Sequence, residues 1–191
     1  MHPLVLASSS PYRQGLLARL RVPFAAAQHR CDESAHEVED PRELPAVLAR
    51  AKAESLRSDH PDALILGSDQ LVLIDGTTLG KPGDRAGARN QLQLLSGRSH
   101  ELLTSVCLLS PDGEAPVRTV VHRMTMRELS QGEIERYLDV DEPFDCCGSY
   151  KVESLGIALL SGIDGDDFTA IEGMPLIAVA ELLRDAGYQV P

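Results

Sequence analysis

The chain has 191 residues, of which 43% are hydrophobic and 25% charged, the balance of an ordinary folded globular protein. Eighteen Lys and Arg against 29 Asp and Glu give a formal net charge of −11, the wrong sign for a protein that gains affinity by neutralising the backbone of DNA or RNA. With no Trp and 4% aromatic residues, a stacking surface for single-stranded nucleic acid is also disfavoured. We therefore expect no nucleic acid polymer as a partner.

The sequence also bears on compartment and domain organisation. No stretch approaches the roughly 20 apolar residues that cross a bilayer, and the start, MHPLVLASSS, lacks the regions of a secretory signal. We expect a cytoplasmic protein that has no membrane partner. Against a prior of roughly 150 residues per domain, and without repeats or linkers, residues 1–191 are predicted to form a single domain, either one body or two lobes around one cleft.

The four cysteines show neither a CxxC pair nor a zinc-finger spacing, so reduced thiols are expected in the cytoplasm. They are Cys31, Cys107, Cys146 and Cys147. The neighbours Cys146 and Cys147 receive no role from the sequence.

The chain begins with a predicted strand and helix. Residues 4–7 form a short apolar run, which predicts a buried strand. Ser10 followed by Pro11 predicts the N-cap and first position of a helix. Residues 22–27 are then predicted to form a second strand.

A helix and a strand are predicted next. From Leu44, apolar residues recur at i, i+3, i+4 and i+7, which predicts an amphipathic helix over residues 41–57 with Lys52 on the flank of its apolar face. Residues 63–66 form a continuous apolar run, typical of a strand buried on both faces. Asp75-Gly76, between two short apolar runs, predicts a hairpin.

The second half of the chain mixes strands with helices. The predicted elements are a helix over 84–95 ended by Gly97, an antiparallel pair of strands over 101–109 and 117–126, a helix from the capping box of Ser130 and Glu133 to about 139, a strand over 157–160, and a helix over 175–186 stopped by Gly187. This order predicts an α/β protein whose mixed sheet is flanked by helices.

The segment SSSPYR, residues 8–13, offers a phosphate site. A strand there leads through serines into a helix N-terminus, where backbone N–H groups and the helix dipole favour an anion. Arg13 would add a bidentate contact. The alternative is a well-capped helix with a surface arginine, and the sequence contains no GxxxxGK[ST] loop.

Asp69 follows the apolar strand predicted over residues 63–66. Working groups collect beyond the carboxyl ends of strands in open α/β sheets, and a carboxylate in that position binds Mg²⁺ or orients a water molecule. The alternative is that Asp69 only forms a turn.

Two further groups carry candidate chemistry. Lys81, in GKP, is one of only three lysines among 18 basic residues and suits a compact point charge on phosphate, the alternative being a solvated loop lysine. Asp32 and Glu33 offer oxygen ligands for a hard divalent cation, the alternative being a solvated acidic loop. The neighbouring His29 and His36 show no HExxH spacing, and we assign them no metal role.

The motifs SSSPYR, DE, LARAKA, GSDQ, GKP, and GSYKVESLG followed by GMPL resemble those of the Maf family of nucleotide pyrophosphatases. The resemblance extends from residue 4 to about 186, in the family's order and spacing. It implies hydrolysis of a nucleoside triphosphate, a small-molecule partner, to the monophosphate and pyrophosphate with a divalent metal cation, Mg²⁺ or Mn²⁺. It also implies a homodimer and a mixed, elongated, twisted sheet flanked by helices, resembling the inosine triphosphate pyrophosphatase-like fold.

The resemblance also assigns residues. It implies phosphate contacts from Ser8, Arg13, Lys52 and Lys81, with Asp69 as the proton acceptor and the cation shared by Glu33 and Asp69. Beside this set, Lys151 in SYKVES is a further candidate for phosphate. The sequence departs from the common family pattern at Cys147, where alanine is commoner, and at Tyr12, where many relatives have a second arginine.

Tyr12, Gln70 and Glu153 replace the Arg, Thr and Gln of the family branch that acts on dTTP and UTP. They resemble the residues of the branch that acts on 7-methyl-GTP, a modified nucleotide, and this resemblance implies a role in clearing such nucleotides from the nucleotide pool. N7-methylation makes guanine cationic, which favours stacking on Tyr12 and charge-assisted hydrogen bonds to Glu153. Two alternatives stay open. One is a nucleotide-binding regulator of cell division without turnover. The other is a phosphatase with Asp69 as nucleophile, against which the lack of a DxD motif weighs.

Overall fold

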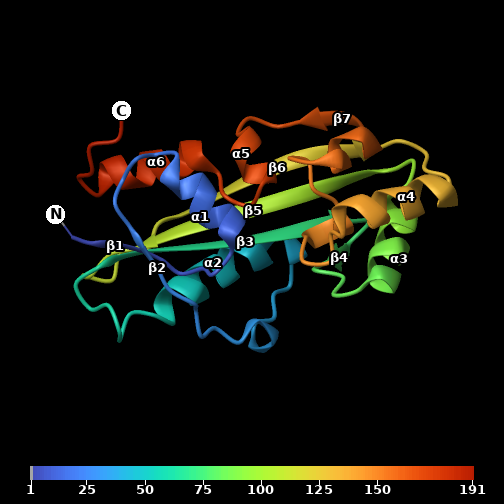
Figure 1. The fold of residues 1–191 in the computed structure, drawn as a ribbon. Coiled ribbons are helices and arrows are strands. Elements are labelled where there is room, and N and C mark those ends of the chain that lie inside the picture. The colour runs from blue at the N-terminus through green and yellow to red at the C-terminus, as the bar shows by residue number, and fades with distance from the viewer. Residues whose placement is uncertain (1) are drawn as a thin grey trace. The chain divides into compact units, whose positions relative to one another are not determined.

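The computed structural model describes residues 2–191 as a mixed sheet with helices on its faces (Figure 1). In chain order the elements are β1 (Leu4–Leu6), α1 (Pro11–Ala18), β2 (Ala25–Ala26), the 3₁₀ turns η1 (Glu33–Ala35) and η2 (Pro41–Glu43), α2 (Leu44–Glu54), β3 (Leu64–Ile74), β4 (Thr77–Leu79), α3 (Arg85–Leu95), β5 (Ser99–Leu109), β6 (Val117–Met126), α4 (Gln131–Asp141), the 3₁₀ turns η3 (Cys147–Ser149) and η4 (Leu155–Leu159), β7 (Leu160–Asp164), α5 (Phe168–Ile171) and α6 (Leu176–Asp185). Within residues 2–191, no helix has both the length and the apolar character of a membrane span.

The strand order in the sheet is β2-β1-β3-β5-β6-β7, and β4 pairs with β3. β1 runs parallel to both β2 and β3, whereas the β3–β4 and β6–β7 pairs are antiparallel. This mixture of pairings confirms the predicted α/β class with a mixed sheet flanked by helices.

The chain divides into two compact units. Unit 1 consists of residues 1–69, 104–120 and 167–191, and unit 2 of residues 70–103 and 121–166. Strands β3, β5 and β6 each contribute residues to both units.

In unit 1 the sheet has a hydrophobic core on each face. Leu4 and Leu6 of β1 pack into one core with α1 and α6, whereas Val5 between them packs into the other core with Ala53 of α2. Figure 1 shows α1 and α6 on one side of these strands and α2 on the other. Because successive strand residues point to opposite faces, a strand covered on both sides is a continuous apolar run, as predicted.

Local signals fix several element ends as the sequence predicts. The Ser10 hydroxyl accepts a hydrogen bond from the Arg13 backbone N–H at 3.4 Å and caps α1, with Pro11 as its first residue. Ser130 and Glu133 form the predicted capping box of α4. After α6, Gly187 has a φ of 88°, the left-handed conformation that glycine adopts most readily.

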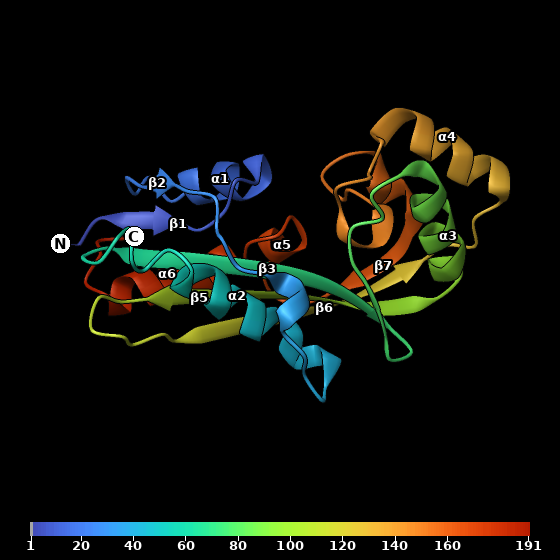
Figure 2. The ribbon, with the colours of Figure 1, turned by 90° about the horizontal axis from the view of Figure 1, so that it is seen from below.

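Unit 2 contains the predicted hairpin and two helices packed side by side. Asp75 and Gly76 have φ angles of 47° and 78°, and Ile74 pairs with Thr77 across the turn. Helix α3 packs against α4 (Figure 2). Glu135 of α4 forms ion pairs with two arginines of α3, Arg85 and Arg89.

Three predicted boundaries are wrong. The strand predicted over residues 63–66 continues to Ile74, so Asp69 lies inside β3 and not after it. The strand predicted over 157–160 is mostly the 3₁₀ turn η4. β7 lies in the more polar segment that follows, whose residues are half-buried or exposed and form no apolar run. The strand predicted over 22–27 is reduced to Ala25–Ala26, because only these residues pair with β1.

Candidate functional site

A buried ion cluster in unit 1 unites three of the predicted site residues. The Lys52 ammonium lies 2.5 Å from Asp69 Oδ1 and 2.9 Å from Glu33 Oε1. The side chains of Lys52 and Asp69 are 4% and 11% exposed, whereas that of Glu33 is 50% exposed. One ammonium group therefore links an inner carboxylate to an outer one at the edge of solvent.

The fold turns Lys52 inward. The buried stripe of α2 consists of Pro45, Leu48, Ala49, Lys52 and Ala53. Lys52 therefore lies within the sheet-facing side of α2, and the prediction that placed it on the flank of an apolar face is wrong. The physical reason is the pairing, since an ammonium can be buried when carboxylates compensate its charge.

Gly67 allows α2 to approach β3 closely enough for this contact. A Cβ atom at Gly67 would lie 2.0 Å from the carbonyl oxygen of Ala49 in α2. Residues two apart on a strand point to the same face, so Asp69 points to the side of β3 on which α2 lies. The close contact at Gly67 thus places Lys52 within reach of Asp69.

Two opposing effects act on the Asp69 carboxylate. Burial raises the pKa of Asp69 above its usual range, and the charge and hydrogen bond of Lys52 oppose this increase. Glu33 raises the pKa of Asp69 further, whereas Arg13 lowers it. A carboxylate whose pKa is raised in this way is a better proton acceptor than an exposed one.

The serine turn and Arg13 lie at the beginning of α1. Ser8 is buried, and its hydroxyl accepts a hydrogen bond from the Ser10 backbone N–H at 3.1 Å. Arg13 Nε donates to the carbonyl oxygen of Gly173 at 3.1 Å, and the Ser68 hydroxyl donates to the same oxygen at 3.0 Å. These bonds fix the base of the guanidinium group, whose two terminal nitrogens are the pair suited to a bidentate phosphate contact.

The sequence alone does not predict that Ser68 and Gly173 support Arg13. Both belong to quoted motifs, Ser68 to GSDQ and Gly173 to GMPL, but only the fold shows that they meet. The sequence likewise indicates no role for His29, whose Nε2 lies 3.8 Å from Glu33 Oε1. Burial and the Lys52 ammonium lower the pKa of His29, which favours its neutral form.

The donor set at the cluster is suited to a hard divalent cation. Glu33 and Asp69 direct carboxylate oxygens at the same ammonium group, so the two side chains already lie close together. Mg²⁺ is commonly held by one or two carboxylates together with substrate phosphates, and this pair fits that role. Over residues 2–191, no group of three or more His, Cys, Asp and Glu side chains is arranged to hold a metal ion.

The remaining predicted residues lie on other elements. Tyr12 is a half-exposed residue of α1 in unit 1. Gln70, Lys81 and Glu153 belong to unit 2. Gln70 follows Asp69 on β3 and Lys81 is an exposed residue between β4 and α3, whereas Glu153 is exposed between η3 and η4.

Two residues that the sequence left open have structural partners in unit 2. Cys147 Sγ donates to the carbonyl oxygen of Gln70 at 3.3 Å. Lys151 Nζ donates to the carbonyl oxygen of Asp141 at 3.0 Å. The ammonium group for which the sequence predicts a phosphate contact thus donates a hydrogen bond to the protein backbone. The phosphate contact of Lys151 stays a prediction.

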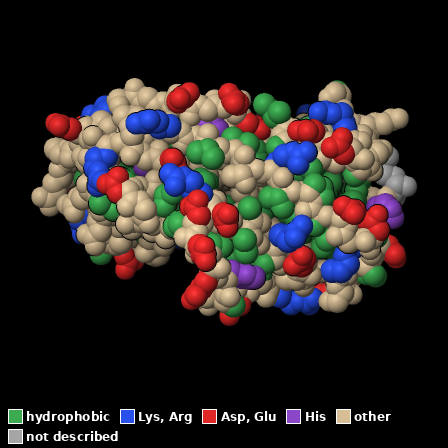
Figure 3. Space-filling view, turned by 180° about the vertical axis from the view of Figure 1, so that it is seen from behind, with side chains coloured by type: hydrophobic (Ala, Val, Ile, Leu, Met, Phe, Trp, Pro, Cys, Tyr) green, Lys and Arg blue, Asp and Glu red, His purple; other side chains and the backbone are tan. Residues whose placement is uncertain are grey.

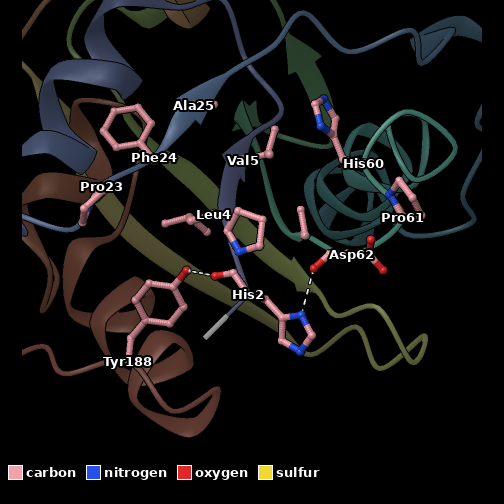
Figure 4. A pocket seen from close by; sticks show the side chains of 12 residues that line it. His2, Leu4, Val5, Pro23, Phe24, Ala25, His60, Pro61, Asp62 and Tyr188 are labelled. Atoms are coloured by element: carbon pink, nitrogen blue, oxygen red, sulfur yellow. Dashed lines mark hydrogen bonds between the residues drawn. The ribbon is translucent and has the colours of Figure 1, made fainter.

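A separate pocket of about 650 Å³ opens in unit 1 at the beginning of β1 and β3 (Figure 4). Mostly apolar side chains such as Leu4, Phe24 and Tyr188 line it. The Tyr188 hydroxyl donates to the carbonyl oxygen of His2, and His2 Nδ1 lies 2.8 Å from the carbonyl oxygen of Asp62. The residues of this pocket are different from those of the ion cluster.

The profile of the Maf family, described as Maf-like protein, matches residues 3–186. The chain is 47% identical over 192 residues to a 7-methyl-GTP pyrophosphatase of Pseudomonas syringae pv. tomato, covering 100% of both chains, and 45% identical over 186 residues to one of Cupriavidus pinatubonensis, covering 97% and 94%. Among solved structures it resembles a HAM1 protein from Coxiella burnetii, with a TM-score of 0.53 and 15% identity over 97% and 100% of the two chains, a likeness of fold. The motifs, the fold and the match over almost the whole chain agree, and the protein belongs to the Maf family.

Proposed function

We propose that the protein is a nucleoside triphosphate pyrophosphatase that hydrolyses 7-methyl-GTP to 7-methyl-GMP and pyrophosphate. The observation that carries the proposal is the buried pair of Lys52 and Asp69, together with the outer carboxylate of Glu33. The relatives that are 45% and 47% identical over almost their whole length carry the name 7-methyl-GTP pyrophosphatase, which supports the choice of substrate.

In the proposed reaction Asp69 accepts the proton of the water molecule that attacks the α-phosphorus. The new bond joins the water oxygen to the α-phosphorus, the bridging bond from the α-phosphorus to the β-phosphate oxygen breaks, and pyrophosphate leaves with the electron pair. Lys52 holds the Asp69 carboxylate in place and favours its ionised form before the proton arrives. Glu33 and Asp69 would hold the divalent cation, Mg²⁺ or Mn²⁺, which when bound neutralises triphosphate charge.

The triphosphate must be bound by a protein with a formal net charge of −11. Figure 3 shows basic and acidic side chains intermingled on the face seen from behind. Arg13, Lys52 and Lys81 would supply the local positive charge that offsets the repulsion between the protein and the triphosphate. Ser8 lies at the turn that leads into α1. The α1 N-terminus adds backbone N–H groups and a favourable dipole.

Tyr12, Gln70 and Glu153 are the proposed determinants of the base. A cationic purine ring gains energy from stacking on an aromatic side chain such as Tyr12. The exposed carboxylate of Glu153 would accept hydrogen bonds from the guanine N1 and N2 donors and partly neutralise the ring.

We also propose that the protein is located in the cytoplasm and forms a homodimer. All four cysteines are free thiols, which suits a reducing compartment. The molar mass measured by light scattering on the eluting protein tests the dimer, and a mass of 20.7 kDa, that of one chain, would contradict it.

An Asp69→Asn variant tests the proposed chemistry, and Asp62→Asn, which changes an exposed carboxylate in the separate pocket, is its matched control. With 7-methyl-GTP and Mg²⁺, we expect the wild type to release pyrophosphate, Asp69→Asn to be slower by about 10²-fold or more, and Asp62→Asn to equal the wild type. Turnover by Asp69→Asn close to that of the wild type would contradict the role of Asp69. Release of free phosphate would indicate a phosphatase, and binding without turnover by the wild type would indicate a regulator.

A further inference from the structure

The segment that carries Glu153 has no regular secondary structure of its own. Residues 150–154, here called the Glu153 loop, lie between η3 and η4 in unit 2. Glu153 itself is exposed, so its own burial does not fix its position. A loop of this kind holds a side chain in place only through contacts with rigid neighbours.

The C-terminal part of α4 supplies such contacts on both sides of Glu153. The Lys151 backbone N–H donates to the Tyr137 hydroxyl at 2.9 Å, and Lys151 Nζ donates to the carbonyl oxygen of Asp141 at 3.0 Å. The Ser154 hydroxyl donates to Asp141 Oδ1 at 2.8 Å. Tyr137 and Asp141 are four residues apart and so lie on one face of the helix.

The burial of Tyr137 and the place of Asp141 at the end of α4 strengthen their hydrogen bonds with the Glu153 loop. Tyr137 is 2% exposed, so water does not readily replace its hydroxyl as the acceptor for the Lys151 N–H. Asp141 is the last residue of α4, where the helix dipole places partial negative charge that favours the Lys151 ammonium.

Further contacts hold the two ends of the loop. At one end Tyr150 is buried, and its hydroxyl lies 2.8 Å from Nε2 of His100 on β5. After the other end, Gly156 packs against Lys151 so closely that a Cβ atom at Gly156 would lie 2.4 Å from the Lys151 carbonyl oxygen. Lys151 and Gly156, on either side of Glu153, are thus in contact with each other. The hydrogen bonds with α4 set the position of the Glu153 loop within unit 2.

We propose that Tyr137 and Asp141 are positioning residues that hold Glu153 for recognition of the methylated guanine base. This inference rests on the proposed function, because it assumes that Glu153 contacts the base. In this view neither residue touches the substrate. Each acts by fixing a neighbour of Glu153, Tyr137 through Lys151 and Asp141 through both Lys151 and Ser154.

Three variants test the inference. Tyr137→Phe keeps the buried ring and removes the acceptor for the Lys151 N–H. Asp141→Ala removes the acceptor for the Ser154 hydroxyl, and Asp141→Asn restores an acceptor oxygen there. Tyr188→Phe is the matched control, because it removes a tyrosine hydrogen bond, to the His2 carbonyl, in the separate pocket of unit 1.

The measurement is kcat/KM for 7-methyl-GTP and for GTP in each variant. For Tyr137→Phe and Asp141→Ala, we expect the ratio of the two values to fall by about threefold to tenfold, mainly through a higher KM for 7-methyl-GTP. Asp141→Asn is expected to recover most of the ratio, and Tyr188→Phe to keep the wild-type ratio. A merely structural role would lower kcat/KM for both nucleotides alike.

The outcomes separate the inference from the proposed function. If Glu153→Gln lowers the ratio while Tyr137→Phe and Asp141→Ala leave it at the wild-type value, the positioning role is wrong. If Tyr137→Phe does not fold, Asp141→Ala and Ser154→Ala decide the question, because Ser154 is exposed and Asp141 is partly exposed. A wild-type protein that does not prefer 7-methyl-GTP contradicts the proposed substrate, and the positioning role is wrong with it.

Discussion

Replacing Lys52 with Met removes the ammonium group between Asp69 and Glu33 but keeps a side chain of similar length. Lys52 and Asp69 are 4% and 11% exposed, so little water replaces the lost ammonium beside the Asp69 carboxylate. Breaking a buried ion pair costs about 3–5 kcal/mol. Because Asp69 can also become neutral by taking up a proton, we expect Lys52→Met to lower the free energy of unfolding by about 3 kcal/mol at neutral pH.

The size of this loss depends on pH. Lys52 lowers the pKa of Asp69 through its charge and hydrogen bond, so its removal raises the pKa of Asp69 in the folded protein further above the unfolded value. A carboxyl group whose pKa is raised by folding favours the folded state at low pH, and this contribution is lost as the pH rises through the folded pKa. Lys52→Met should therefore lose more stability at about pH 8 than at about pH 5.5.

The assay is urea denaturation of the wild type, Lys52→Met, Asp69→Asn and the double variant at both pH values. At the higher pH, we expect the double variant to lose about 2 kcal/mol less unfolding free energy than the sum of the two single losses, because an amide beside Met carries no uncompensated charge. Single effects that add within about 0.5 kcal/mol at both pH values would refute the direct pairing of Lys52 with Asp69.

Three other changes have expected outcomes. Gly67→Ala would place a Cβ atom 2.0 Å from the Ala49 carbonyl oxygen, so we expect the free energy of unfolding to fall by about 3 kcal/mol and pyrophosphate release to be slower. Its control is Gly15→Ala, whose Cβ atom would have no neighbour within 4 Å and which should be neutral or stabilising in the same denaturation assay. Ser130→Ala removes the capping box of α4 and should cost about 1 kcal/mol, measured as a lower Tm. Burial lowers the pKa of His100 to about 4, so as the pH falls the unfolded chain takes up a proton at His100 before the folded protein does. Between about pH 6.5 and pH 4, the free energy of unfolding should therefore fall by more in the wild type than in His100→Gln. An equal fall in both proteins would contradict the assignment to His100.

Features that depend on a few neighbouring residues are predictable from this sequence. Alternation on a two-sided sheet produces the apolar run around Leu4–Leu6, and the Asp75-Gly76 pair specifies a tight hairpin because both residues adopt positive φ angles. The Ser130 capping box needs only a spacing of three residues. In each case the interacting groups lie within a few positions of one another along the chain.

Features that depend on distant segments are not predictable in this way. Gly67-Ser68-Asp69 has the composition of a turn, but the segment stays extended because it is paired within the sheet and covered by α2 at Gly67. Lys52 is buried because it meets Asp69, 17 residues along the chain. The bond from the Ser68 hydroxyl to the Gly173 carbonyl joins residues 105 positions apart, so no local pattern contains it.

We propose that this Maf protein releases pyrophosphate from 7-methyl-GTP in preference to the unmethylated nucleotide. The most direct test is the ratio of kcat/KM for 7-methyl-GTP to that for GTP, with dTTP and UTP in the same series and pyrophosphate as the measured product. We predict a ratio of roughly tenfold or more, which corresponds to about 1.4 kcal/mol in the transition state. Equal values for 7-methyl-GTP and GTP, or a clear preference for dTTP or UTP, would contradict this substrate preference.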